Sequence, residues 1–349
     1  MNPAVRALVF AIPGDLQART GGYGYDRRMI EELRAQGWQV RVLALGGGYP
    51  APSAQECAQA EARFAALADG AVVLVDGLAY GAMHALAARE HARLRLVALV
   101  HHPLALETGL DPARAQQLLD SERQALQLAH AVVATSHSTA RQLQALFGLP
   151  AQRVHVAPPG CDRAASAAPR EASAQVRLLS VGALIPRKGL DLLVDALAPL
   201  RELPWTLRIV GAARDAPTAA ALRAQVARHG LEQRIELVGE VDDVACEYAQ
   251  ADVFVLPSRY EGYGMVFAEA LAAGLPVLGC DAGAVAEVVP EDAGLLVPVD
   301  DVAALGDALR RLITDAALRA RLATGARHAA RSLPQWRDSA AALARALAA

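Results

Sequence analysis

The sequence predicts an α/β chain with two doubly wound domains in tandem, each built on a parallel sheet. Short runs rich in β-branched residues alternate with longer helical patterns through both halves of the chain. The length of 349 residues is enough for two domains of roughly 150 residues each. Apolar residues make up 54% of the chain, which suits two buried sheets covered by helices. A cleft is expected where the strand ends of the two domains face each other.

The first half of the chain, residues 1–163, is expected to form the N-terminal domain. Pro13-Gly14 ends its first strand, and the run from Thr20 to Gly24 opens its first helix. Strands are expected at Val5–Ile12, Gln39–Leu45, Ala71–Asp76, Leu94–His101, Ala131–Thr135 and Arg153–Ala157. Helices are expected at Tyr25–Gln36, Ser53–Leu67, Tyr80–His91, Pro112–Leu128 and Ser136–Phe147.

A linker is expected at residues 164–175, which are small and polar and carry no core pattern. Residues 176–333 then repeat the alternation. Strands are expected at Val176–Val181, Thr206–Gly211, Ile235–Gly239, Val253–Leu256, Pro276–Cys280 and Gly294–Val297. Helices are expected at Leu190–Leu200, Ala216–Arg228, Val244–Gln250, Gly264–Ala273, Val302–Leu312 and Ala316–Ala330. In residues 334–349 a last helix, Trp336–Leu347, is a candidate to cross back onto the N-terminal domain.

Composition argues against several classes of protein. The net charge is -3 with both signs interspersed, so no nucleic-acid partner is expected. The 4 cysteines lie far apart without a CxxC pair, which argues against a zinc site or a disulfide scaffold and fits a reducing cytoplasm. Neither a signal peptide nor an apolar run of about 18 residues is recognised, so no membrane span is expected. We expect no metal and no cofactor.

Two carboxylates, Glu261 and Glu269, lie in an apolar, glycine-punctuated segment with seven residues between them. Gly262 and Gly264 allow close backbone approach at a helix entry, whose N–H groups suit hydroxyl or phosphate oxygens. Glu269 lies among apolar residues, where a carboxylate is costly unless it is hydrogen-bonded, and sugar hydroxyls would supply such bonds. The alternative is that Glu261 is only an acidic residue near a helix start and Glu269 a solvated one.

A second candidate site is the turn from Ser180 to Leu190, which contains Gly182, Arg187 and Lys188. Cations at a helix start oppose the helix dipole, unless an anion lies between them and the peptide N–H groups. A diphosphate is the natural candidate, with Arg187 or Lys188 as its counter-charge. The alternative is a solvated basic turn.

The pair His101-His102 closes a buried strand at its carboxyl end, where ligands bind in doubly wound sheets. A histidine there can hydrogen-bond a hydroxyl or move a proton, although a structural role is as frequent. Gly22 lies in a glycine-rich helix start that is not GxGxxG and is not followed by a ribose-reading acidic residue. Dinucleotide binding is therefore unsupported, and a merely flexible loop is the alternative. Asp-x-Asp, HExxH, GxSxG and the Walker lysine motif are absent.

These residues resemble glycosyltransferase family 4, a retaining group with the two-domain GT-B architecture. The segment from Glu261 to Val277 is similar to the family's Glu-x7-Glu signature. Gly182 to Gly189 is similar to its Gly…Lys-Gly turn, although Ala183 stands where the family often has arginine. Weaker similarities are Gly21-Gly22, Val133 to Ser136 and Ala157 to Asp162.

The resemblance implies a role for each motif. Glu261 would hold hydroxyls of the donor sugar, helped by the backbone of Gly262, Tyr263, Gly264 and Met265. Glu269 would hold the ribose hydroxyls of the nucleotide. Lys188 would neutralise the diphosphate leaving group, with Gly182 in the same turn and Arg187 in place of the missing arginine.

In the N-terminal domain, the resemblance implies that His101 would lie near the sugar, with His102 as the alternative. Gly22 would pack against the phosphate or the acceptor. His101, Lys188 and Glu261 are the expected catalytic residues, and the other named positions are expected to bind substrate.

The expected reaction moves a hexosyl or N-acetylhexosaminyl group from a nucleotide diphosphate sugar to an acceptor hydroxyl, with retention and without metal. Sugars, lipid-linked molecules and small molecules are all candidate acceptors, and a lipid acceptor implies peripheral contact with a membrane. A nucleotide-sugar epimerase and a non-catalytic nucleotide-sugar binding protein are the alternatives. A phosphorylase would need a pyridoxal-phosphate lysine and a longer chain.

Overall fold

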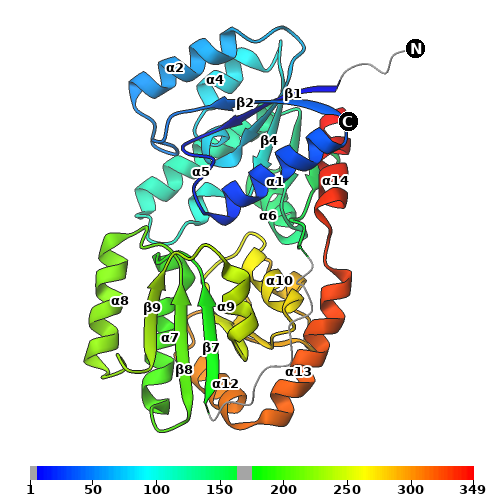
Figure 1. Ribbon diagram of the computed structural model, residues 1–349. Helices are drawn as coiled ribbons and strands as arrows, with labels where there is room; N and C mark the ends of the chain where they lie inside the picture. The colour runs from blue at the N-terminus through cyan, green and yellow to red at the C-terminus, as the bar shows by residue number, and fades with distance from the viewer. Residues whose placement is uncertain (1–5, 163–174) are drawn as a thin grey trace. The chain divides into compact units, whose positions relative to one another are not determined.

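A computed structural model describes residues 6–162 and 175–349. The chain divides into two compact units (Figure 1). Unit 1 comprises Met1–Gly160 together with Pro334–Ala349, and unit 2 comprises Cys161–Leu333. The linker predicted at residues 164–175 lies outside the described residues except for Gln175.

Unit 1 is built on a parallel sheet of six strands in the order β2-β1-β3-β4-β5-β6. The central strands are buried except at the first residues of two of them, Val72 and Arg95, as expected for a parallel sheet with both faces covered by helices. All six strands lie where the sequence predicts them, within two residues at each end. Their bounds are β1 (Arg6–Ile12), β2 (Trp38–Ala44), β3 (Val72–Asp76), β4 (Arg95–Val100), β5 (Ala131–Ala134) and β6 (Val154–Val156).

The strand order of unit 1 reverses between β1 and β3, because the chain leaves β1 towards one edge and continues from β3 towards the other. Ligands of doubly wound sheets bind outside the carboxyl ends of the strands at such a switch point. Asp76 ends β3, and His101 directly follows the neighbouring strand β4. Both side chains therefore belong to the edge of the sheet where a ligand is expected.

The helices of unit 1 include one that begins earlier than predicted. We expected this helix to begin at Tyr25, but α1 begins at Gly21, because Thr20 accepts a hydrogen bond from the Tyr23 N–H at 3.2 Å and caps it. Of the predicted helix Tyr80–His91, the part His84–Glu90 is helical, and a separate short helix, Gly77–Tyr80, precedes it. The helices are α1 (Gly21–Ala35), α2 (Ala54–Ala65), α3 (Gly77–Tyr80), α4 (His84–Glu90), α5 (Pro112–Leu128), α6 (His137–Phe147) and α14 (Trp336–Ala348), with short 3-10 helices η1 (Leu104–Leu106) and η2 (Ala151–Arg153).

The C-terminal helix α14 packs against α1, β5 and β6 and so completes unit 1 (Figure 1). The Trp336 ring lies 6.0 Å from the Tyr25 ring, and the Arg28 guanidinium lies 5.2 Å from the Trp336 ring. A side chain at Gly160 would collide with the backbone of Trp336. The start of α14 is therefore packed tightly against the end of the first segment of unit 1.

Unit 2 is a second parallel sheet of six strands, in the order β12-β11-β10-β7-β8-β9. Its order reverses between β7 and β10, which are paired in parallel. The turn after β7 and the loop after β10 therefore meet at the carboxyl edge of the sheet. The strands are β7 (Val176–Val181), β8 (Trp205–Val210), β9 (Ile235–Gly239), β10 (Val253–Leu256), β11 (Val277–Cys280) and β12 (Gly294–Val297).

Helices cover both faces of the sheet of unit 2, and their positions agree with the predicted ones apart from the short α11. Gly264 stands just before α10, so this helix begins one residue later than expected. The helices are α7 (Leu190–Leu197), α8 (Ala216–Arg228), α9 (Val244–Gln250), α10 (Met265–Ala272), α11 (Val285–Val288), α12 (Val302–Thr314) and α13 (Ala316–Ala329), with 3-10 helices η3 (Pro186–Lys188), η4 (Ala198–Leu200) and η5 (Ala330–Ser332).

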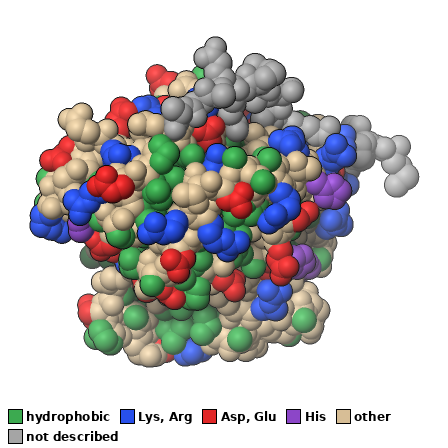
Figure 2. Space-filling view, turned by 90° about the horizontal axis from the view of Figure 1, so that it is seen from below, with side chains coloured by type: hydrophobic (Ala, Val, Ile, Leu, Met, Phe, Trp, Pro, Cys, Tyr) green, Lys and Arg blue, Asp and Glu red, His purple; other side chains and the backbone are tan. Residues whose placement is uncertain are grey.

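The described helices include none that is both long enough and apolar enough to cross a membrane. Figure 2 shows one face of the molecule, on which basic and acidic side chains lie interspersed. On that face neither acidic nor basic side chains form a large patch, in keeping with the net charge of -3.

Candidate functional site

In unit 2 the turn after β7 carries Gly182, Arg187 and Lys188. It ends at Gly189, whose φ of 64° is left-handed. A side chain at Gly189 would collide with the Pro257 carbonyl oxygen after β10, and a Cβ at Gly182 would lie 3.3 Å from Lys188 Cε. The two glycines therefore let the turn and its lysine lie close against the loop after β10.

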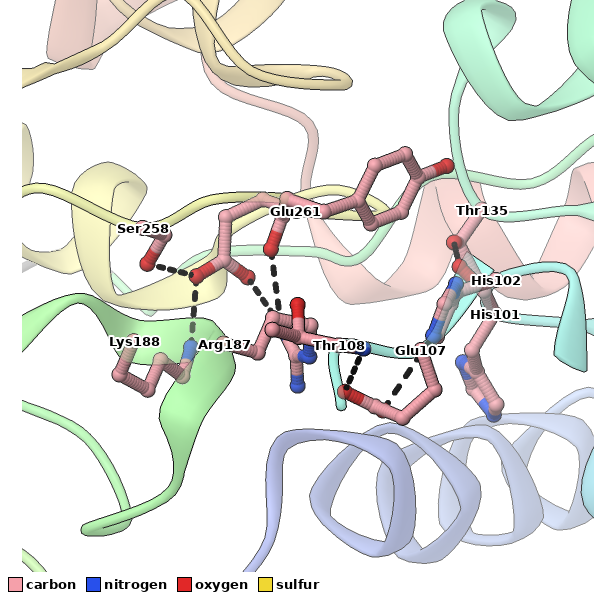
Figure 3. A network of polar contacts seen from close by, with 10 residues as sticks. His101, His102, Glu107, Thr108, Thr135, Arg187, Lys188, Ser258 and Glu261 are labelled. Atoms are coloured by element: carbon pink, nitrogen blue, oxygen red, sulfur yellow. Dashed lines mark hydrogen bonds and ion pairs between the residues drawn. The ribbon is translucent and has the colours of Figure 1, made fainter. Parts of the chain in front are cut away.

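Lys188 and Glu261 meet where these two segments touch (Figure 3). Lys188 Nζ donates to Glu261 Oε1 at 2.6 Å, and Ser258 Oγ donates to the same oxygen at 2.6 Å. The other carboxylate oxygen, Oε2, lies 3.5 Å from Arg187 Nη1. The Glu261 side chain is only 7% exposed, so its charge is balanced by these cations and not by water.

Glu261 stays ionised because of its two basic neighbours. Burial alone would raise the pKa of its carboxyl, but the charges of Lys188 and Arg187 and the hydrogen bonds from Lys188 and Ser258 hold that pKa below its ordinary value. Sequence reasoning placed Lys188 at a phosphate and Glu261 at a sugar. The structure adds that the two side chains touch each other directly.

Arg187 and Arg259 join the turn to the loop through the backbone. Arg187 donates to the Tyr260 carbonyl at 2.9 Å, and the Arg259 N–H donates to the Arg187 carbonyl at 2.8 Å. The Arg259 guanidinium donates to the Pro186 carbonyl at 2.6 Å and to both carboxylate oxygens of Asp191, at 3.0 and 2.7 Å. Arg259 is a residue that sequence reasoning missed. Its position directly before the glutamate loop was the only signal.

Gly262, Tyr263, Gly264 and Met265 form the entry to α10. Gly264 has a φ of 88°, and a Cβ there would lie 2.7 Å from the Phe267 ring. The N-cap position of α10 is Gly264, which has no side chain to accept from the first turn, so the backbone N–H groups and positive dipole end of α10 suit an anionic or hydroxyl ligand.

Glu269 lies one turn into α10 and has a different partner. Tyr248, on α9, donates its hydroxyl proton to Glu269 Oε2 at 2.9 Å. Burial raises the pKa of Glu269 above its ordinary value, the Tyr248 hydrogen bond opposes this, and the nearby charge of Asp162 adds to it. Tyr248 was not identified from the sequence, because a tyrosine on an apolar helix face is ordinarily interpreted as a core residue.

In unit 1, His101 lies between two carboxylates. Its Nε2 is 3.5 Å from Asp26 Oδ1 and 3.4 Å from Asp76 Oδ2. Burial alone would lower the pKa of His101, but Asp26 and Asp76 raise it to about 10. A Cβ added at Gly22 would lie 3.7 Å from the His101 ring, so the glycine start of α1 lies beside this histidine.

His102 points to a different partner: its Nε2 lies 3.4 Å from Glu107 Oε2 (Figure 3). Sequence reasoning did not identify Asp26 or Asp76. A signal for Asp26 was present, because it shares the buried face of α1 with Met29, Ile30 and Leu33. An acidic residue on such an apolar face is unusual.

The atoms of Asp26, Asp76 and His101 lie within 4.8 Å of one another, which is close enough for a shared metal ion as well as for a shared proton. Chemically, the described residues thus offer two kinds of site. Unit 2 offers cations and a helix start whose N–H groups suit a phosphate, and carboxylates that suit hydroxyls. Unit 1 offers a histidine held between two acids.

Comparison with protein families gives matches in both units. The model "Glycosyl transferases group 1" matches residues 175–315, and "Glycosyltransferase Family 4" matches residues 71–165. Among curated proteins, a D-inositol 3-phosphate glycosyltransferase of Xylanimonas cellulosilytica is 35% identical over 254 residues, covering 67% of this chain and 60% of that protein. A GDP-mannose-dependent alpha-(1-6)-phosphatidylinositol monomannoside mannosyltransferase of Mycolicibacterium smegmatis is 32% identical over 241 residues, covering 63% of this chain and 62% of that protein.

Solved structures match nearly the whole chain. A sucrose-phosphate synthase from Thermosynechococcus elongatus has a TM-score of 0.81 at 23% identity, covering 97% of this chain and 98% of that one. Anabaena HepE in complex with UDP and glucose has a TM-score of 0.79 at 20% identity, covering 98% of this chain and 99% of that one. At such identities the likeness concerns the fold.

Two parallel doubly wound sheets of this kind, with these neighbours, define the GT-B fold. The chain belongs to glycosyltransferase family 4. It spans 60% of the Xylanimonas relative and 54% of a second D-inositol 3-phosphate glycosyltransferase, from Jonesia denitrificans.

Proposed function

We propose that this chain transfers a hexosyl or N-acetylhexosaminyl group from a nucleotide diphosphate sugar to an acceptor hydroxyl, with retention at the anomeric carbon. The observation that carries the proposal is the contact of Lys188 with Glu261 at the switch point of unit 2. A cation alone at this position would suit any anion, and a carboxylate alone would suit any hydroxyl group. Together they suit a ligand with a phosphate next to a sugar.

In this proposal Lys188 and Arg187 neutralise the leaving diphosphate, together with the N–H groups at the start of α10. An ammonium carries three donors, so Lys188 can hold Glu261 and a phosphate oxygen at once. Negative charge that develops on the leaving group is then met by fixed donors, which is the largest contribution to catalysis in many enzymes. No metal is required for this step.

The two glutamates bind different parts of the donor. Glu261, kept ionised by its cations, accepts hydrogen bonds from hydroxyls of the transferred sugar. Glu269, held by Tyr248, accepts from the ribose hydroxyls. Gly262, Tyr263, Gly264 and Met265 contribute backbone N–H groups.

In the same proposal unit 1 supplies the acceptor side. Gly22 lies against His101 and lets a ligand approach the start of α1, and His101 or His102 hydrogen-bonds a sugar hydroxyl. The acceptor attacks the face from which the diphosphate leaves, and the leaving phosphate takes the acceptor proton. This route needs no carboxylate nucleophile and leaves Glu261 to its binding role.

Relatives suggest which donors to test first. One curated relative is named for GDP-mannose, and HepE has been solved with UDP-glucose, at a TM-score of 0.77. Sucrose, lipid-linked inositols and lipopolysaccharide cores appear in the names of other relatives and neighbours, so the acceptor panel should contain sugars and glycolipids. A thermal-shift panel of nucleoside diphosphates and their sugars identifies the base and then the sugar.

A direct test uses an unusual property of the sequence: Lys188 is its only lysine. Reductive methylation therefore labels Lys188 and the terminal amine alone, and peptide mass spectrometry reads both in one sample. A bound nucleoside diphosphate should slow labelling of Lys188 about tenfold or more, since tight ligands protect in proportion to occupancy. The nucleoside should not slow it, and the terminal amine is the internal control. Equal labelling of Lys188 with a saturating diphosphate would refute its phosphate role.

The reaction itself is tested by product analysis. NMR of the product gives the anomeric configuration, and retention is expected. Transfer should persist in EDTA. Release of free nucleotide and an altered sugar without an acceptor would identify an epimerase instead. Donor binding without product across the acceptor panel would identify a binding protein.

A further inference from the structure

His101 has two carboxylate neighbours, although one would be enough to hold a proton on its imidazole. Asp76 alone would serve as its partner: it ends β3, caps α3 by accepting from the Leu78 N–H at 2.8 Å with Oδ1, and turns Oδ2 to His101. Asp26 is an additional carboxylate from α1, fully buried at 0% exposure. Neither of its oxygens has a hydrogen-bond partner within the part of the chain that the structure describes.

A buried carboxylate without a partner is costly, so its charge needs compensation. Among the described residues the cation at ion-pair distance from Asp26 is His101, at 3.5 Å. Arg27 acts on Asp26 only through its longer-range charge, and the Arg27 guanidinium donates to the carbonyls of Leu16 and Ala18. Asp26 therefore depends on a positively charged His101.

Other groups around His101 do not compete for its proton. Tyr25, also on α1, presents its ring edge-on at 5.2 Å, and its hydroxyl donates to the Ala157 carbonyl at 3.0 Å. The groups that set the charge of the imidazole are thus Asp26 from α1 and Asp76 from β3, with Arg27 more remote. His101 Nε2 is itself buried, although its side chain is 26% exposed, so the exposed part of the ring lies away from the two acids.

We propose that Asp26 is a positioning residue that keeps His101 in the doubly protonated form, so that Nδ1–H acts as a hydrogen-bond donor and not as a base. This inference rests on the proposed function and assigns the role of His101 within it. A histidine that takes a proton from the acceptor must be neutral at the working pH. An imidazolium cannot accept that proton, so the leaving phosphate remains its destination.

The directions of the pKa shifts of His101 and Asp26 agree with this geometry. Asp26 and Asp76 raise the pKa of His101 to about 10, while burial raises the pKa of Asp26 to about 6 against the opposing effect of His101. The two acids thus favour the charged form of His101, and the charge of His101 in turn favours the ionised form of Asp26.

The decisive test reads the protonation of the ring directly. Nitrogen-15 NMR of the histidine rings distinguishes imidazolium from both neutral tautomers, and His101→Gln assigns the signal among the nine histidines. In the wild type we expect the His101 ring to stay doubly protonated at pH 8. In Asp26→Asn we expect it to lose its proton at a pH lower by about one unit or more, a tenfold fall in proton affinity.

Glu122→Gln is the matched control. Glu122 is a carboxyl of unit 1 with 1% exposure, it accepts from the Leu104 N–H at 2.9 Å, and it is not a partner of His101. The His101 signal should not move in this variant. A neutral ring in the wild type at pH 8, or an unchanged titration in Asp26→Asn, would overturn the proposal. So would a ring signal that shifts on addition of EDTA, because a metal ion and not a proton would then join the cluster.

If Asp26→Asn does not fold, Asp76→Asn supplies the converse test, because Asp26 is then the carboxylate left beside His101. The amide oxygen of this variant can keep the cap on Leu78. The pKa of His101 should then stay above its ordinary value, and a His101 titration in the ordinary range in this variant would contradict the proposal.

An activity measurement then connects the ring to the reaction. In Asp26→Asn the alkaline limb of kcat/KM should move to lower pH together with the NMR titration, while affinity for a nucleoside diphosphate stays unchanged. Because the NMR result needs no turnover, it stands even if the chain has no transferase activity. A pH profile of kcat/KM that does not move, despite a shifted ring, would show that the charge of His101 has no part in the reaction.

Discussion

At the scale of single residues, two glutamates with seven residues between them behave in opposite ways. The pKa of Glu261 lies below its ordinary value because two cations outweigh burial, whereas burial keeps the pKa of Glu269 above its own. The same residue type therefore has its pKa shifted in opposite directions in the two places. The signature that joins them in the sequence does not show this difference.

Glu269 gives a prediction about nucleotide binding. Glu269→Ala should weaken binding of nucleoside and nucleoside diphosphate alike, by about 10–100-fold, because hydrogen bonds to a charged group are worth about 1.5–3 kcal/mol. Tyr248→Phe, which removes only the hydroxyl that holds Glu269, should cost less in both. Calorimetric titration measures all four affinities. Unchanged nucleoside affinity in Glu269→Ala would contradict the ribose role.

A further prediction concerns why position 188 holds a lysine and not an arginine. All other basic residues of the Lys and Arg count are arginines, so this chain uses arginine wherever a cation suffices. The methylene stem of Lys188 runs beside Gly182 and its ammonium reaches Glu261, whereas a planar guanidinium on such a stem is wider. Lys188→Arg should therefore lower kcat/KM about tenfold or more, although the charge is kept. Wild-type kcat/KM in this variant would show that any cation serves there.

At the scale of elements, the site depends on two loops that hydrogen-bond each other. The turn at Pro186–Gly189 and the loop at Pro257–Glu261 follow adjacent parallel strands and are joined by Arg187 and Arg259. Lys188 and Glu261 lie 73 positions apart, and the pairing of β7 with β10 brings them together.

Arg259→Ala should loosen this junction without touching the proposed ligand groups. We expect affinity for the nucleoside diphosphate to fall about tenfold, since displacements near 1 Å are costly in such sites. Nucleoside affinity should stay the same, because Glu269 and Tyr248 lie outside the junction. Arg208→Ala is the control: it removes another arginine of unit 2 that pairs with acids, Glu247 and Glu236, away from the turn. Equal losses of nucleoside and diphosphate affinity in Arg259→Ala would argue against the junction.

At the scale of the whole molecule, buried acids make stability depend on pH. Burial raises the pKa of Glu122 from 4.5 to about 8, so the folded state holds this proton more tightly than the unfolded state. The stabilisation from this group is fully present below about pH 4.5 and is lost as the pH rises through about 8.

Glu122→Gln should remove this dependence. The midpoint of thermal unfolding of wild type, relative to the variant, should fall between pH 5 and pH 9, by about 2–4 °C for each kcal/mol lost. The variant should be the more stable protein at pH 9. Parallel midpoints of both proteins over this range would mean that Glu122 is not buried as the structure shows.

The sequence predicted most of the fold, because alternating strand and helix patterns are local. All twelve strands lie close to their predicted ranges. The predicted range of the first helix was wrong in starting at Tyr25, because Thr20 caps a helix that includes the glycines, and of the predicted helix Tyr80–His91 only Tyr80 and His84–Glu90 are helical. Capping hydrogen bonds and short turns depend on local backbone geometry, which the spacing of apolar residues does not reveal.

For the candidate site, the sequence predicts three motifs: the glutamate segment, the Arg187-Lys188 turn and the histidine pair. The contacts between their side chains come from the tertiary structure. Strand order places Lys188 on Glu261, Tyr248 on Glu269, and Asp26 with Asp76 on His101. Such contacts join residues that are far apart in the chain, and their charges follow from burial and neighbours, so no local pattern of residues can encode them.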